Sequence, residues 1–346
     1  MQLLSGDPDT RDKPQPKYPD WMSVGNYCRS QQGPRTSPLP AYVGVNPPTT
    51  YNGPAYLGDA YGPFIVTGDP NAPNFTVPNI GLKTEGESRR LGRRVSLREN
   101  IDNLQRAFDV KGELESLDQF ETQAMTLLTS PEAKAAFDLS QEDPKVIARY
   151  DTSNLVPPEK ISKRWNNHKN YRDHGQSLGK LMLMARRLCE HGTRFVTVTT
   201  NFVWDFHADK NNATLDEGML YVGRPFDHAV SAFIEDVAER GLSDKILLVA
   251  CGEMGRTPAI NKKGGRDHWA RLAPLLLSGG GLQMGQVIGQ SDAHAGEPNS
   301  DPISIPNLNA TILRSLVDVS ELRLQSGVPS TLLRLLEDGQ PIKALL

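Results

Sequence analysis

Four residues with chemically active side chains gather in one short stretch, residues 251–269, with the sequence CGEMGRTPAINKKGGRDHW. Glu253 and Arg256 directly follow the apolar run KILLVA, and Asp267 and His268 lie just before another apolar run, LAPLLL. Glycines stand between them and let the backbone approach a ligand closely. The stretch is either a polar loop that closes a strand or a place where an acid, a base and a cation meet.

A second pair of metal-binding side-chain types follows the strand-like run RFVTVTT. Asp205 and His207 come a few residues after it, in NFVWDFH. Imidazole nitrogen mixed with carboxylate oxygen suits zinc, manganese or iron, whereas oxygen alone suits magnesium or calcium. Two such ions side by side can hold both the attacking and the leaving oxygen of an ester. We therefore expect a divalent ion (zinc, calcium or manganese) with these candidate ligands: Asp205, His207, Glu253, Asp267 and His268.

Two arginines that each follow a glycine, Arg256 and Arg266, are candidates for holding the substrate. A guanidinium fork donates paired hydrogen bonds to a phosphate or a sulfate. With Glu253 as an acid–base group they form the candidate catalytic set, and the expected activity is metal-dependent hydrolysis of a small anionic ester. Each residue alone has a plainer explanation as a turn, a cap or an ion pair. Their common position at one edge of the expected sheet favours a shared site.

The elements that would position these residues alternate between helix and strand from residue 175 onward. QSLGKLMLMARRLCEHG predicts an amphipathic helix that ends at Gly192, just before the strand RFVTVTT. RPFDHAVSAFIEDVAERG predicts a second helix, followed by the strand KILLVAC and then by LAPLLLSGG. Near-continuous apolar strands between helices indicate an α/β fold with a largely parallel sheet flanked by helices. Ligands bind beyond the carboxyl ends of such strands, where the candidate residues fall.

Composition divides the chain into three parts of what we expect to be one domain. Residues 1–90 read as an extended Pro-, Gly- and aromatic-rich segment packed on the core, because 14 of the 26 prolines lie in the first 80 residues. Residues 91–174 read as a helical insertion that begins with the capping box of Ser96 and Glu99 and ends in the charged surface loop PPEKISKRWNNHKNYRDHG. Residues 175–346 form the α/β core. Five histidines are expected to be structural or solvated: His168, His174, His191, His228 and His294.

Overall composition excludes several classes of partner. The net charge of −3 provides no positive field for nucleic acid, and no apolar run is long enough to enter a bilayer as a span. The three cysteines are far apart and indicate neither disulfides nor a cysteine-based metal site. The first residues, MQLLSGDPDTRDKP, show no secretory signal. The expected partner is a small anionic ester, and no oligomeric state can be inferred.

Several stretches resemble a known bacterial family. FVTVTTNFVWDFH, the run from FDHAVSAFIEDVAERG to GRDHW, and LAPLLLSGGGLQMGQVIGQSD closely resemble the domain of unknown function 1501 family. GEMGRTP together with GRDHW is highly specific for that family. The resemblance implies a core like that of alkaline phosphatases and sulfatases. In such a core, Asp205 and His207 would be a metal-binding pair and His268, with Asp267, a later ligand; Glu253 stands where relatives usually place an Asp-His pair.

The same resemblance implies a chain that starts late. Typical members are exported and carry a first strand and a glycine-rich loop before the LLSG seen here at residues 3–6. We therefore expect an N-terminally shortened member that lacks its first strand region, one metal ligand and the nucleophile. Its hydrolysis would be impaired, and with this start it would be cytoplasmic. The alternative is a non-catalytic member of the same fold that binds a ligand or a partner in the same cleft.

Overall fold

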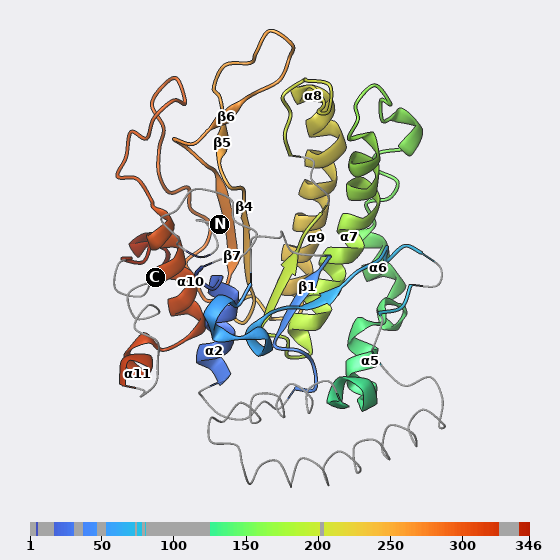
Figure 1. Cartoon of the computed structure of the whole chain (residues 1–346), viewed down its shortest axis with the longest axis vertical. Coiled ribbons are helices and arrows are strands. Elements are labelled where there is room, and N and C mark those ends of the chain that lie inside the picture. Colours follow the sequence, from blue (N-terminus) through green and yellow to red (C-terminus); the bar gives the residue numbers. More distant parts are fainter. Residues whose placement is uncertain are drawn as a thin grey trace.

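The protein is a mixed α/β structure whose helices cover short β-sheets (Figure 1). The computed structural model describes residues 5, 17–30, 37–46, 53–72, 75–77, 80, 125–200, 204–324 and 339–346. The helix expected from the capping box of Ser96 and Glu99 lies outside these residues. The α/β class is confirmed, and its largest sheet among the described residues is parallel, as expected.

That sheet has the strand order β2-β1-β3, with every pair parallel. The strands are β1 (Tyr42–Val45), β2 (Phe64–Val66) and β3 (Phe195–Val198). The central strand β1 comes from the proline-rich segment, which we expected to lie over the core in an extended form. A central strand is possible there because YVGV itself contains no proline and each of its residues can donate to a neighbouring strand. The same segment also forms the helix α2 (Trp21–Ser30).

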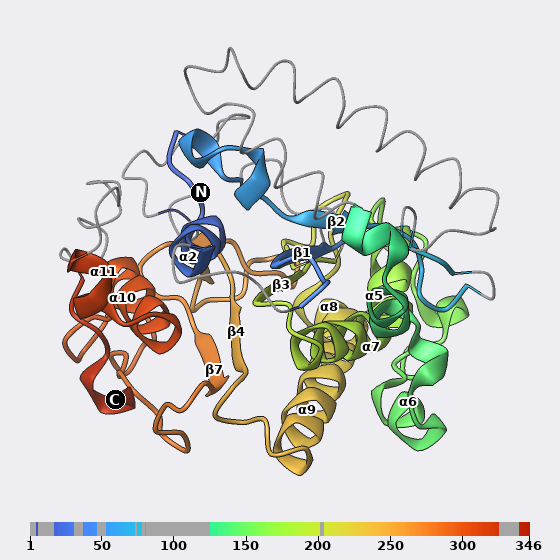
Figure 2. The ribbon, with the colours of Figure 1, turned by 90° about the horizontal axis from the view of Figure 1, so that it is seen from below.

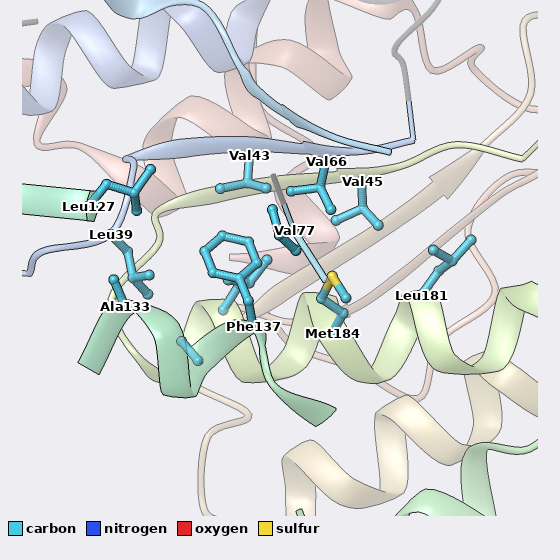
Figure 3. Packing of buried hydrophobic residues seen from close by; sticks show 12 residues of the cluster. Leu39, Val43, Val45, Val66, Val77, Leu127, Ala133, Phe137, Leu181 and Met184 are labelled. Atoms are coloured by element: carbon cyan, nitrogen blue, oxygen red, sulfur yellow. The ribbon is translucent and has the colours of Figure 1, made fainter. Parts of the chain in front are cut away.

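Side chains of β1 alternate between the two faces of the sheet and build two different cores. Val43 and Val45 point toward α7 (His168–Glu190) and α5 (Pro131–Phe137), where they pack with Phe137 (Figure 3). Tyr42 points the other way and packs with Phe195 against α2. Burial on both faces explains why β1 has no polar residue on either face.

Helix α7 begins earlier than expected. The sequence predicted a surface loop through residue 174, yet the helix starts at His168 and runs for 23 residues. The buried side chains of Tyr171 and His174 extend its inner face toward its N-terminus, where a pattern dominated by charged residues had hidden them. Helix α5 begins after Ser130, whose side chain accepts a hydrogen bond from Ala133 N, and has proline at its first position.

A second helix, α9 (Arg224–Glu239), packs beside α7, and α6 (Pro144–Tyr150) contacts both (Figures 1 and 2). Arg186 of α7 is fully buried where the three helices meet. Its guanidinium contacts Asp236 of α9, Glu142 just before α6, and Glu190. Further ion pairs in this network join Arg187 to Glu142 and Arg240 to Asp236, Glu142 and Glu190.

The strands β4 (Leu247–Cys251) and β7 (Leu275–Gly279) do not join the parallel sheet, contrary to expectation. They pair with each other, antiparallel, in a two-stranded sheet. The connection between them explains the antiparallel pairing: residues 252–274 contain no helix, and parallel pairing needs a crossover element. Within this connection, β5 (Gly255–Arg256) and β6 (His268–Trp269) form a small antiparallel ladder.

The remaining elements complete the two ends of the molecule. Helix α10 (Ile305–Leu316) contacts α2, and α10 lies with α11 (Val319–Leu324) on the opposite side of β4 and β7 from α9 (Figures 1 and 2). Helix α8 (Leu215–Gly218) and a π-helical turn (Met219–Gly223) lead into α9. The short 3-10 helices are Ala55–Leu57, Asp59–Tyr61, Leu139–Gln141, Pro158–Lys160 and Lys343–Leu345. None of the described helices combines the length and the apolar character of a membrane span.

Candidate metal centre

Three of the predicted metal ligands converge on one point. Asp205 Oδ1 lies 3.2 Å from His268 Nε2 and 3.5 Å from His207 Nε2. The two Nε2 atoms are 3.2 Å apart. Within the described part of the chain, Asp205, His207 and His268 form the group of potential ligands that lie close enough together to share an ion.

The separations fit a small divalent cation. Tetrahedral ligands about 2.0–2.1 Å from zinc lie about 3.3 Å from one another, which matches the observed 3.2–3.5 Å. Two nitrogens and one carboxylate oxygen are also a common catalytic zinc set, with the fourth position open. The residues present therefore fit a zinc-like ion better than calcium, which takes six to eight oxygen ligands.

The chain brings these ligands together through the β5–β6 ladder. In that ladder Arg256 lies directly opposite His268. The adjoining turn packs against the segment of Asp205 and His207: the N–H of Arg266 donates to Phe206 O at 2.8 Å. Gly265 is required at this approach, because a Cβ atom there would lie 2.3 Å from the carbonyl carbon of His207.

Asp267 lies behind His207 rather than in the ligand group. Its Oδ1 is 3.1 Å from His207 Nδ1, the ring nitrogen that faces away from the convergence point. A carboxylate in this position fixes the tautomer and orientation of a ligating imidazole. Asn261 supports the pair, since its Nδ2 donates to His207 O at 3.0 Å and lies 3.5 Å from Asp267 Oδ1.

Sequence reasoning overlooked Asn261, although a signal was present. Its Oδ1 accepts the N–H groups of Lys263 and Gly265, each at 3.0 Å. Asparagine followed by glycines is a turn pattern in which the side chain bonds to backbone two or more residues later. The pattern NKKGG therefore predicts the turn, but not that the same side chain reaches His207.

Arg256 shares the carboxylate of Asp205 with the histidines. Its Nη2 lies 2.5 Å from Asp205 Oδ1 and 3.7 Å from Glu253 Oε1. Burial raises the pKa of Asp205, but the hydrogen bond and charge of Arg256, with His268 and His207, outweigh it and hold that pKa below its usual value. The ligand oxygen is therefore ionised at neutral pH.

The other two predicted site residues are placed differently. Glu253 points largely into solvent, with 65% of its side chain exposed, and is not one of the three convergent ligands. Arg266 donates from Nη1 to Thr257 O at 3.2 Å. The structure thus gathers Asp205, His207 and His268, with Asp267 and Arg256 beside them.

His174, expected to be structural or solvated, is structural, and it lies on a helix rather than in the expected charged loop. It is buried on α7 and its Nε2 lies 3.2 Å from Val222 O. Burial lowers its pKa to about 4, so the ring is neutral at physiological pH. It also packs edge-on against Trp204, the residue before Asp205, with ring centroids 6.2 Å apart.

Comparison with known proteins gives one match. A family model described as a protein of unknown function (DUF1501) covers residues 11–346. No curated protein and no solved structure matches the sequence.

Proposed function

The chain belongs to the DUF1501 family of proteins of unknown function, and from its candidate metal centre we propose that it is a metal-dependent hydrolase of anionic esters. The ester would be a sulfate or a phosphate, as in a sulfatase-like enzyme. The observation that carries the proposal is the convergence of Asp205, His207 and His268 within 3.5 Å of one another. The three distances between the ligating atoms are similar, and the atoms come from two separate segments of the chain, as expected when they surround one ion.

Zinc is the ion that these ligands favour, ahead of manganese and calcium. When bound, such an ion supplies Lewis-acid polarisation of an ester oxygen and a means of activating water. The chain's own groups would do the rest. Asp267 orients the ring of His207 through Nδ1, and Asn261 holds both.

Arg256 is the group best placed to orient the ester. It lies beside the convergence point, and its Nη1 is buried with no hydrogen-bond partner among the described residues. A free guanidinium N–H next to a metal centre can bind the oxygen on which negative charge develops. Glu253, nearby and exposed, is the candidate proton donor or acceptor.

Metal content of the purified protein tests the proposal directly. We expect close to one zinc per chain after reconstitution, and loss of it in Asp205→Ala and His268→Ala. Glu253→Gln serves as the matched control, because it removes a nearby charge outside the three-ligand group. Failure of the wild-type protein to retain any divalent ion would overturn the proposal.

One observation favours the alternative of a non-catalytic binding protein. Arg256 Nη2 already neutralises the Asp205 oxygen at 2.5 Å, as an ion pair would without any metal. Turnover of aryl sulfates and aryl phosphates by zinc-loaded protein separates the two candidates. Turnover that disappears in His268→Ala supports the hydrolase, whereas full metal binding without turnover supports the binding protein.

A further inference from the structure

A large cavity borders the metal centre. Its volume is about 1510 Å³, and it runs between β3 and β4. Arg256, Arg266 and Trp204 line it, so it adjoins the convergence point of the three ligands. Ligand sites of about 300–1,000 Å³ hold drug-sized molecules, which means that this cavity exceeds what a bare sulfate or phosphate would fill.

Two buried arginine groups in the cavity wall lack partners. Arg256 Nη1 and Arg266 Nε are shielded from solvent and have no hydrogen-bond partner among the described residues. A buried N–H of a charged group that makes no hydrogen bond is costly, and native structures leave few of them. Arg256 is the last residue of β5, and Arg266 lies two residues before β6, so both arginines come from the ladder that carries His268.

Part of the cavity wall is aromatic, although Glu253 beside Arg256 also lines the cavity. Trp204 packs edge-on against Phe226 with ring centroids 5.4 Å apart, and it lies 6.2 Å from Phe206. Its side chain is nevertheless exposed, so part of the indole surface remains open. The neighbouring His174 is neutral and adds no charge, although its buried Nδ1 also has no described partner.

We propose that the ester taken by this site carries a flat apolar body, which lies in the cavity against Trp204 while its anionic group binds Arg256 and Arg266. This inference rests on the proposed function for the identity of the anion, but not on the presence of a metal. An apolar group moved from water to such a wall gains free energy in proportion to the area it buries. Aromatic rings on aromatic rings gain a further amount from their geometry.

Calorimetric binding of two sulfonates to the full chain tests the inference. Sulfonates present the same three oxygens as a sulfate ester, and their carbon–sulfur bond is not an ester bond that a hydrolase would cleave. We expect 2-naphthalenesulfonate to bind on the order of 100-fold more tightly than methanesulfonate, because one buried ring system replaces one methyl group. Equal affinities would overturn the inference.

Two matched variants locate the effect. Trp204→Ala should reduce the preference for the naphthalene compound about tenfold or more, and Trp204→Phe should retain most of it. Arg266→Gln should weaken both sulfonates by a similar factor, since it removes a contact to the shared anionic group. A naphthalene preference that survives unchanged in Trp204→Ala would place the ring elsewhere and reject the proposal.

These results are independent of the hydrolase proposal. Both sulfonates can be measured with and without a chelator, because Trp204, Arg256 and Arg266 are not metal ligands. Loss of the naphthalene preference with intact zinc binding would reject only the apolar substrate. A clear preference in a protein that takes up no metal would reject only the hydrolase.

Discussion

Two clusters of charge at opposite ends of α7 use the same residue types in different ways. At the C-terminal end, Arg186 and Asp236 are buried, and the arginine makes ion pairs to three carboxylates. Beyond the N-terminal end, Arg256 meets Asp205 beside two histidines, in a more exposed setting with an unused guanidinium N–H. The first cluster joins three helices, whereas the second joins loops that follow strands.

The difference lies in burial and in the number of ion pairs: Arg186 is fully buried and contacts three carboxylates, whereas Arg256 is partly exposed and contacts two. Buried charges are tolerated when they are paired and hydrogen-bonded, and such pairs then become indispensable to the fold. Ligand atoms that converge in a partly exposed setting, as those of Asp205, His207 and His268 do, are instead available to bind an ion. We therefore expect changes in the first cluster to affect folding and changes in the second to affect binding.

Removal of Asp236 should have the largest effect. Asp236→Ala would remove the carboxylate that contacts Nε of the fully buried Arg186 and Nε of Arg240. It would also remove the acceptor of the Tyr150 hydroxyl. Loss of one partner of a buried pair costs about 3–5 kcal/mol in the free energy of unfolding. Urea denaturation measures this value. The control Glu239→Ala removes an exposed partner of Arg149 and should leave the free energy of unfolding nearly unchanged.

The second largest effect should be a loss of stability in acid, through the same cluster. Burial opposes ionisation of Glu142, but Arg186, Arg187 and Arg240 outweigh it and lower its pKa from the ordinary 4.5 to about 2. Because the folded pKa is the lower one, the stabilisation is complete above pH 4.5 and is lost as the pH falls toward 2. As the pH is lowered across this range, the urea midpoint of unfolding should fall less in Glu142→Gln than in the wild type. An unchanged pH slope in that variant contradicts the assignment.

Metal should stabilise the second cluster by a smaller amount. If zinc binds only the folded protein, one hundred times its dissociation constant adds about 2.7 kcal/mol to the free energy of unfolding. Thermal unfolding with zinc, and again after a chelator, measures the increment. It should vanish in His268→Ala, whose metal-free stability should match that of the wild type. Equal stabilisation of both proteins would exclude this site.

The smallest effect should come from Asp267, which contacts the ligand His207 but is not itself one of the three convergent ligands. Asp267→Asn keeps the shape of the side chain that contacts His207 Nδ1 but removes its charge. Loss of such a supporting carboxylate lowers metal affinity about 10–100-fold. Competition with a chromophoric chelator gives the affinity. Glu253→Gln should change it less, and a larger loss there would restore Glu253 to the ligand set.

Local patterns in the sequence predicted many of the helices and strands. Helix α9, the strands β3, β4 and β7, and the convergence of Asp205, His207 and His268 followed from periodicity and from the rule on strand ends. Helix α7 began earlier than predicted, because charged residues on its outer face obscured the buried ones. The proline-rich segment supplied a central strand, because four residues between prolines were enough.

The sequence by itself determined which side chains were available and which elements carried them, since helix and strand periods and strand-end positions are local properties. Tertiary structure alone decided their roles. It turned β4 and β7 into an antiparallel pair, placed Arg256 opposite His268, and left Glu253 in solvent. It also placed Asp267 against Nδ1 of His207 and the amide of Asn261 on the His207 carbonyl oxygen. Such roles depend on distances between residues some 60 positions apart, which no local pattern encodes.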